Sequence, residues 1–491
     1  MIYKEMYTAM RKKIAIILFG AMLISTMSGC GNAGSDDDTV PSTAGDPEQT
    51  STESEETRKQ ADLPDVAFDG YEFHFLHWQT TYSVDISAEE ATGDALNDAV
   101  YERNRGVEEK YNVKLSAEYL PATNIVTSFR ASVMANDNAY DAVFPQAYYA
   151  SGAITDELCL DLYQLPYVDF SDPWWDQGSV ETLSTGDKLF MVNSDFTLSD
   201  KNSTGCIIFN KKLQEENGIE DLYRLVNEGK WTLDKLTLLS ENVSVDLDGN
   251  GIYDQEDRYG IVASAGFSYQ LLHGANCWYV SKDSDGIPQL SFNNERTISI
   301  AQRIMSIFEN TEVLYNTHIT STPDETRINM FLENKGLFSN TNLGAVFSLR
   351  NMEADFGILP IPKYDEEQER YYSFSSVYSG GIMMVPKTAD NLERTAVVLT
   401  ALASGSEDVY KAYYEGALKG KVARDEGASD MIDILLSTRC YDWGEFLAIG
   451  GFPGEFVNLT LKGNKNVSTL YAQYESKMLS DLEKINSLFG E

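Results

Sequence analysis

Two hydrophobic periods alternate along the first part of the chain. Strand-like patterns cover 71–78, 113–120 and 140–146, and apolar residues at helical spacing cover 93–111 and 122–136. The first strand pattern, YEFHFLHW, is rich in aromatic residues, as strands often are. A strand–helix–strand–helix–strand order is typical of a parallel α/β sheet, so we expect one here.

The same alternation returns in the second half of the chain. The patterns predict a strand leading into a helix over 204–218, a helix over 230–243, a strand over 259–265, a helix over 297–310, strands over 336–342, 354–362 and 380–386, and helices over 391–405 and 468–489. Thr232 is the expected N-cap of its helix and Asp234 lies in the first turn, and both stabilise a helix start. We therefore expect a second α/β region.

The first 30 residues have the pattern of an export signal. The charged segment MRKK precedes the apolar run IAIILFGAMLIS, which is too short to span a bilayer. The small residues of MSGC then end at Cys30, which resembles the lipobox of bacterial lipoproteins, although Met27 stands where leucine is usual. The resemblance implies removal of 1–29 and a lipidated, palmitate-bearing Cys30 at the outer face of the cell membrane. An ordinary signal peptide with an incidental cysteine is the alternative.

A polar, acidic segment follows the cysteine. Residues 31–64 contain no aromatic residue and almost no large aliphatic one, so we expect 30–66 to be a flexible tether. The whole chain has 38 Lys and Arg against 76 Asp and Glu, a formal net charge of -38. Such a charge repels phosphate backbones, which excludes nucleic-acid binding.

Four cysteines remain after Cys30: Cys159, Cys206, Cys277 and Cys440. No pair of them has the spacing of metal ligands. Export permits disulfides, and the sequence does not choose among the possible pairings. Four small buried apolar residues are an equal alternative.

Residues 246–257, DLDGNGIYDQED, have the spacing of a calcium-binding loop. The expected ligands are Asp246, Asp248, Asn250, the Ile252 carbonyl, Asp254 and Asp257. A strand pattern follows where a calcium sensor would have a second helix, so we expect a structural ion that stabilises the region. Glu256 is a rival for the last ligand position, and a solvated acidic turn is the alternative to a metal site.

Several segments of the second half share a likeness with one family. TGCIIFNKKLQEENGIED, GKWTLDKLTLLSENV, ADFGILPIPKYDE and SSVYSGGIMMVPKTADNLERTAVVLTALAS resemble, in this order, the family 1 extracellular solute-binding proteins of bacterial ABC importers, which include maltose-binding protein. The resemblance implies a two-lobed, type II periplasmic-binding-protein-like α/β fold, with hinge crossings and a ligand cleft between the lobes. Lobe one would comprise 67–204 plus 338–388, and lobe two 205–337 plus 389–491.

Candidate ligand-binding residues follow from the strand pattern. Ligands of α/β sheets sit beyond the carboxyl ends of strands, and aromatic faces there match the C–H faces of sugars. The candidates at such positions are Trp78, Tyr148, Tyr269, Trp278, Tyr378 and Trp443. Any one aromatic residue is more often part of a core, so we expect about half of them to line the cleft.

The expected function is the capture of a carbohydrate, an oligosaccharide above all, for the permease of an ABC transporter. We expect a monomer that is held at the membrane by its lipid and is not an enzyme. A secreted glycoside-active enzyme is one alternative, because a chain with 76 acidic residues contains carboxylate pairs by chance. A binding protein for a non-sugar solute, such as a peptide, is the other.

Overall fold

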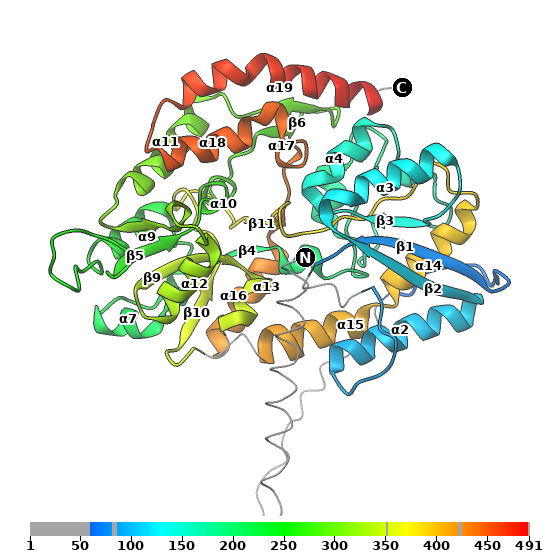
Figure 1. Ribbon diagram of the computed structural model, residues 1–491, viewed down its shortest axis with the longest axis horizontal. Coiled ribbons are helices and arrows are strands. Elements are labelled where there is room, and N and C mark those ends of the chain that lie inside the picture. Colours follow the sequence, from blue (N-terminus) through cyan, green and yellow to red (C-terminus); the bar gives the residue numbers. More distant parts are fainter. Residues whose placement is uncertain (1–58, 81–85, 350–351, 421–424, 490–491) are drawn as a thin grey trace, which may run out of the picture. The chain divides into compact units, whose positions relative to one another are not determined.

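Two β-sheets organise the folded part of the chain (Figure 1). The computed structural model describes residues 59–80, 86–349, 352–420 and 425–489, which all belong to the unit Lys59–Glu491. The expected signal peptide, Cys30 and most of the expected tether lie outside these residues. Among the described residues, no helix is both long enough and apolar enough to cross a membrane.

The first sheet has three parallel strands in the order β2-β1-β3. The strands are β1 (Tyr71–Trp78), β2 (Val113–Leu120) and β3 (Ala142–Phe144), and the neighbouring helices are α2 (Ala95–Tyr111), α3 (Ala122–Ala135) and α4 (Ala147–Thr155). The side chain of Asp94 caps α2 by accepting from the amides of Leu96 and Asn97. The parallel α/β arrangement predicted for this region is confirmed.

The second sheet has five strands in the order β10-β4-β9-β5-β8. The strands are β4 (Gly205–Asn210), β5 (Tyr259–Ala263), β8 (Leu314–Asn316), β9 (Gly336–Asn342) and β10 (Phe356–Leu359). β4 runs antiparallel to both β9 and β10, whereas β9, β5 and β8 run parallel to one another. The carboxyl ends of these three parallel strands therefore meet at one edge of the sheet.

Helices and short strands complete the described residues. Those of the middle of the chain are α5 (Gln177–Leu183), α6 (Ser199–Asn202), α7 (Lys211–Glu216), α8 (Leu222–Asn227), α9 (Leu233–Glu241), α10 (Phe267–Gly274), β6 (Val280–Lys282), β7 (Pro288–Leu290), α11 (Glu295–Glu309), α12 (Pro323–Leu332) and α13 (Leu343–Val346). Those of the last part are β11 (Ser373–Phe374), α14 (Leu392–Ser404), α15 (Glu407–Lys411), α16 (Glu426–Ser437), β12 (Arg439–Cys440), α17 (Trp443–Phe446), α18 (Phe452–Leu461) and α19 (Val467–Phe489). Thr232 caps α9 as expected, by accepting from the amide of Lys235.

The division of the chain between the two regions differs from the prediction. The resemblance places 338–388 in lobe one, but β9 and β10 pair with strands of the second sheet. It places 389–491 in lobe two, but α14 packs against α2 beside the first sheet. The segment 380–386 forms isolated bridges to Val143 and Gln146 instead of a regular strand. The chain thus passes between the regions at places that hydrophobic periodicity does not mark.

Segments at 199–205, 375–381 and 437–443 connect the two regions. Thr204 forms a bridge with Ser375, and β11 pairs in parallel with β12. The hydroxyl oxygens of Ser203 and Ser375 lie 2.6 Å apart. These contacts tie the connecting segments to one another, as expected of a hinge.

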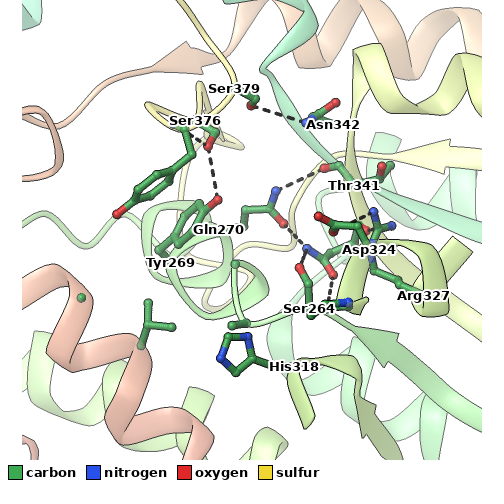
Figure 2. A pocket seen from close by; sticks show the side chains of 17 residues that line it. Ser264, Tyr269, Gln270, His318, Asp324, Arg327, Thr341, Asn342, Ser376 and Ser379 are labelled. Atoms are coloured by element: carbon green, nitrogen blue, oxygen red, sulfur yellow. Dashed lines mark hydrogen bonds and ion pairs between the residues drawn. The ribbon is translucent and has the colours of Figure 1, made fainter. Parts of the chain in front are cut away.

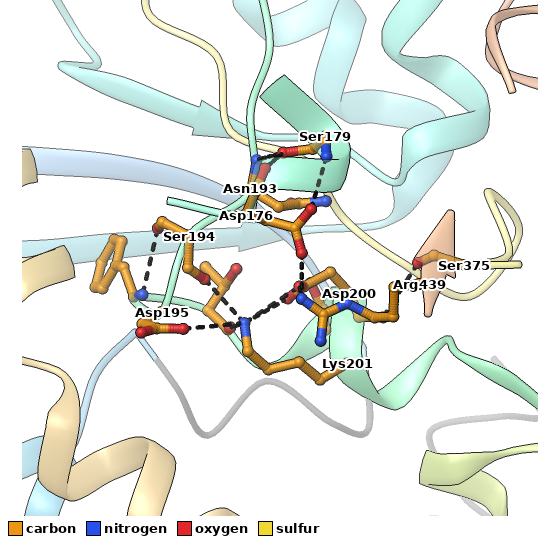
Figure 3. Close-up of polar contacts among 12 residues, drawn as sticks. Asp176, Ser179, Asn193, Ser194, Asp195, Asp200, Lys201, Ser375 and Arg439 are labelled. Carbon is orange, nitrogen blue, oxygen red and sulfur yellow. Dashed lines mark hydrogen bonds and ion pairs between the residues drawn. The ribbon is translucent and has the colours of Figure 1, made fainter. Parts of the chain in front are cut away.

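Buried charges reinforce this hinge (Figure 3). Arg439 pairs with Asp176 and lies 3.7 Å from a carboxylate oxygen of Asp200. The Nζ of Lys201 donates to the carbonyl oxygen of Ser194 at 3.0 Å and lies 3.2 Å from Asp200. Burial raises the pKa of Asp200. The pKa of Asp176 is lowered, because the charge and hydrogen bond of Arg439 outweigh the effect of burial.

The end of the expected tether lies against the folded region. Leu63 and Val66 are partly buried and pack against the core, and Lys59 pairs with Asp172. Residues 59–66 are therefore part of the folded unit and not of a free tether.

The four cysteines after Cys30 are buried and form no disulfide with one another, which agrees with the alternative of small apolar residues.

Candidate functional site

A cavity of about 500 Å³ lies at the carboxyl ends of β9, β5 and β8 (Figure 2). Its wall comes from residues 264–270 after β5, His318 after β8, and 340–342 at the end of β9. The start of α12, the 376–379 part of the hinge and two residues of α18 complete it. Ligands of α/β sheets bind beyond the carboxyl ends of the strands, so the cavity lies where a ligand is expected.

Amide side chains brace the floor of the cavity. The Nδ2 of Asn340 donates to Ser264 Oγ at 3.2 Å and to Gln270 Oε1 at 3.1 Å, and its Oδ1 accepts from the Ser264 amide at 3.0 Å. Gln270 in turn donates to the carbonyl oxygen of Thr341 at 3.2 Å. These bonds hold the polar side chains in fixed positions at the cavity wall.

One charged pair belongs to the cavity wall, and both members come from α12. Arg327 is only 5% exposed, and its guanidinium donates to the carbonyl oxygen of Asn340. Its Nη2 lies 3.5 Å from a carboxylate oxygen of Asp324, whose side chain is 81% exposed. Burial lowers the pKa of Arg327, against the opposing effect of the Asp324 charge.

Two of the aromatic candidates line the cavity. Tyr378 is 44% exposed, and its ring centroid lies 6.1 Å from that of Tyr269. The hydroxyl of Tyr269 lies 3.2 Å from the Ser376 hydroxyl, and burial raises its pKa to about 12. A third candidate, Tyr148 of α4, stacks on Tyr378 with a centroid distance of 5.0 Å. These three tyrosines bring together α4, α10 and the hinge.

The structure places the three tryptophan candidates elsewhere. Trp443 is 2% exposed and packs edge-on against Phe489, so it belongs to the core. Trp78 is 8% exposed, and a Cβ at Gly381 would lie 2.9 Å from its Nε1, so hinge backbone covers it. Trp278 is half-buried and donates to the side chain of Asn276. None of the three is part of the cavity wall, which corrects their expected place in the cleft.

A buried histidine fixes the helix that carries Tyr269. His273 Nδ1 lies 2.7 Å from the Tyr269 carbonyl oxygen, and its Nε2 lies 3.1 Å from Asp442. Both ring nitrogens face acceptors, which favours the doubly protonated ring. The pKa of His273 is raised, because the Asp442 carboxylate outweighs the lowering effect of burial. Burial raises the pKa of the neighbouring Glu445 to about 7.

Sequence reasoning missed the polar residues of the cavity. Asn340, Thr341 and Asn342 end a strand whose bounds were predicted correctly, and the polar side chains at its end were the available signal. Asp324 and Arg327 have no such signal, because they lie on α12, a helix that the hydrophobic pattern did not predict. Only the tertiary fold brings α12 to the strand ends.

The expected calcium ligands are partly gathered. Ligand oxygens of Asp246, Asp248 and Asp257 lie within 4.8 Å of one another. Asp257 is fully buried and accepts from the amides of Leu247 and Asp254. Asp254 lies outside this trio. The Nδ2 of Asn250 donates to Asp248 at 2.8 Å, and its Oδ1 accepts from the Ile252 amide at 2.6 Å. The rival ligand Glu256 pairs with Lys335 at 3.0 Å. Three converging carboxylates fit a hard cation such as calcium.

The loop joins two elements that touch. A bridge between Val245 and Arg258 closes it, and β5 begins directly afterwards. A Cβ at Gly260 would lie 2.2 Å from the carbonyl oxygen of Ser240, so only glycine allows α9 and β5 to approach this closely. The loop therefore lies at a tightly packed junction.

Two sheets, a hinge and a cavity at the strand ends define a two-lobed type II α/β fold of the maltose-binding-protein kind. Neither a protein-family model nor a curated protein matches the chain.

Among solved structures, the chain is similar to the maltose-binding periplasmic protein MalE of Listeria monocytogenes in complex with maltose, with a TM-score of 0.56 and 11% identity over 86% of this chain and 99% of that chain. It is similar to the cyclic α-maltosyl-1,6-maltose binding protein of Arthrobacter globiformis, with a TM-score of 0.55 and 14% identity over 84% and 99%. It is also similar to UgpB of Mycobacterium tuberculosis in complex with glycerophosphocholine, with a TM-score of 0.55 and 13% identity over 85% and 99%. At such low identities, the structural similarity establishes a shared fold and nothing more.

Proposed function

We propose that the protein captures a carbohydrate, an oligosaccharide above all, in this cavity and delivers it to the permease of an ABC importer. The observation that carries the proposal is the placement of two tyrosine rings and a braced set of amides and hydroxyls at the carboxyl ends of three parallel strands. Tyrosine faces suit the C–H faces of sugars, and amides suit their hydroxyls. Two of the similar structures are named for binding maltose or a cyclic maltosyl sugar, which supports this ligand class.

An oligosaccharide array followed by calorimetry on the hit tests the proposal. We expect one saccharide to bind with a dissociation constant of about 1 μM or tighter, roughly -8 kcal/mol. Uptake of that sugar by cells with and without the protein tests delivery to the permease. UgpB shares the fold and has glycerophosphocholine as its ligand, so a non-sugar solute is the competing class. Binding of glycerophosphodiesters or peptides, with no saccharide bound, would contradict the proposal.

The protein acts by binding without turnover. Hinge closure around a ligand suits capture and release. Prolonged incubation with the bound sugar should leave it intact by chromatography, and the appearance of shorter saccharides would assign the cavity to a glycoside-active enzyme.

Cys30 anchors the protein to the outer face of the membrane. The support is the charged, apolar and small-residue run that precedes it. Cys30→Ala should release the protein from membranes or block its processing, as followed by cell fractionation and mass spectrometry. A mutant that is processed normally and stays with the membrane would contradict the anchor.

The loop 246–257 binds a structural calcium ion that strengthens the junction of α9 and β5. Support comes from the three converging carboxylates. An ion that binds only the folded state stabilises it by about 2.7 kcal/mol at a hundredfold excess over its dissociation constant. Thermal melts should therefore shift upward with calcium, and Asp248→Asn should reduce the shift. Asp285→Asn, in an exposed turn elsewhere, is the control. Equal midpoints with calcium and with chelator, and no calcium by elemental analysis, would contradict the proposal.

A further inference from the structure

The charges around the cavity are unevenly solvated. Arg327 is 5% exposed, whereas the Asp324 side chain that neutralises it is 81% exposed. The distance between Arg327 Nη2 and the carboxylate oxygen is 3.5 Å. The Arg327 Nε has no hydrogen-bond partner among the described residues. A positive charge is thus buried at the cavity with its counter-charge in water.

Such an arrangement leaves the cation short of a partner. Charge-assisted N–H···O bonds are about 2.7–2.9 Å long, so the Asp324 pair is stretched, and water screens an exposed carboxylate. A guanidinium presents a planar fork that matches the two oxygens of a carboxylate. The cavity wall therefore holds a donor set that an anionic group of a ligand would complete.

The helix that carries Arg327 adds to the effect. α12 begins at Pro323, which lines the cavity together with Asp324. The N-cap residue Thr322 makes no side-chain capping bond. The unsatisfied amides of a helix start carry a partial positive charge that favours anions. Arg327 and the start of α12 thus act in the same direction.

We propose that the ligand is an acidic saccharide whose carboxylate, as in a uronic acid, binds against Arg327 while a sugar ring lies on Tyr378. This inference deepens the proposed function and rests on it. A singly charged, planar carboxylate suits the site better than a phosphate, because Asp324 lies beside Arg327 and repels a doubly charged group more strongly.

Matched pairs of saccharides test the charge directly. The probes are trigalacturonate, a hyaluronan tetrasaccharide and a glucuronate-branched xylotetraose, each beside its carboxyl-reduced, neutral counterpart. Calorimetry with the full-length mature protein should show at least tenfold tighter binding of one acidic probe over its neutral partner. The preference should shrink as ionic strength rises.

Variants assign the preference to this pair. Arg327→Gln should abolish the preference for the acid, and Arg327→Lys should keep part of it because it keeps the charge without the fork. Because Arg327 is buried and its variants can fail to fold, Asp324→Asn is the second test: removing the competing carboxylate should raise the ratio of acidic-probe to neutral-probe affinity several-fold. Glu312→Gln, an exposed residue before the amino end of β8 and outside the cavity wall, is the control and should leave this ratio unchanged.

The outcomes separate this inference from the proposed function. Binding of neutral saccharides with no preference for acids overturns the inference and leaves carbohydrate capture standing. A preference for acids that Asp324→Asn and folded Arg327 variants leave unaltered also overturns it, because the carboxylate then binds elsewhere. Failure to bind any saccharide removes the proposed function and the inference together.

Discussion

At the scale of single residues, exposure separates aromatic side chains that can meet a ligand from those that hold the fold. Tyr378 is 44% exposed at the cavity, and Trp443 is 2% exposed in the core. The sequence does not distinguish them, since both lie beside a predicted strand. Truncation of Tyr378 should therefore affect ligand affinity, whereas truncation of Trp443 should affect stability.

Tyr378→Ala should weaken sugar binding at least tenfold, about 1.4 kcal/mol, because it removes a stacking face. It should cost little stability. Trp443→Ala should instead cost about 3–5 kcal/mol of unfolding free energy, as large core truncations do. Calorimetry and denaturant melts of both variants measure this. Tyr167→Ala, which removes a similarly exposed ring (52%) away from the cavity, is the control. Equal affinity in Tyr378→Ala and wild type would remove Tyr378 from the site.

Glu445 should make stability depend on pH. Burial raises its pKa from 4.5 to about 7, so between these values the folded protein holds a proton that the unfolded chain has lost. Stability should therefore fall as pH rises through this window, by about 3 kcal/mol in total. The raised pKa of His273 has the same sign and extends the fall to higher pH.

Glu445→Gln should flatten the slope of unfolding free energy between pH 5 and 7, measured by denaturant titration at each pH. Glu102→Gln, on the exposed face of α2, should leave the slope as in wild type. Parallel curves for the wild type and Glu445→Gln would show that this carboxyl does not titrate in the window.

Which cavity residues can be predicted from the sequence depends on whether a local pattern or a long-range contact places them there. Tyr269 was found because the end of β5 is visible in the pattern, and Tyr378 because it lies beside the expected strand 380–386. Arg327 was not, because its role comes from its approach to Asn340, a contact between an amphipathic helix and a strand end. Trp78 was misplaced because the hinge backbone at Gly381 covers it, and no local pattern reports that contact.

At the scale of elements, local periodicity predicted β1, β2 and β9 to the residue, and α2, α3, α9, α11, α14 and α19 to within about three residues. Other helices, such as α10, α12 and α16, were not predicted. The mixed direction of the second sheet was not predicted. Of the lobe boundaries that the resemblance implied, 204/205 falls in a connecting segment, and 337/338 and 388/389 do not. Strand direction and hinge position depend on long-range pairing, such as β4 between β9 and β10, which periodicity does not encode.

The hinge is the element where a buried charge matters most. Arg439→Met should destabilise the protein by about 3–5 kcal/mol, because it leaves the buried carboxylate of Asp176 without its partner and leaves Asp200 with Lys201 alone. Arg130→Met is the control, since its pair with Asp156 is exposed and worth at most about 1 kcal/mol. Chemical unfolding of both variants measures the difference. Equal losses would show that the hinge network contributes no more than a surface pair.

At the scale of the whole molecule, the hinge makes each region discontinuous along the chain. Val143 of β3 exchanges backbone hydrogen bonds with Met384, both at 2.8 Å, and the Met383 amide donates to Val192. A ribosome must therefore make most of the chain before the first sheet meets its last partners. Contacts of such long sequence separation slow folding and leave apolar surface uncovered meanwhile. The nascent chain should consequently remain incompletely folded, and a client for chaperones, until residues beyond α14 have emerged.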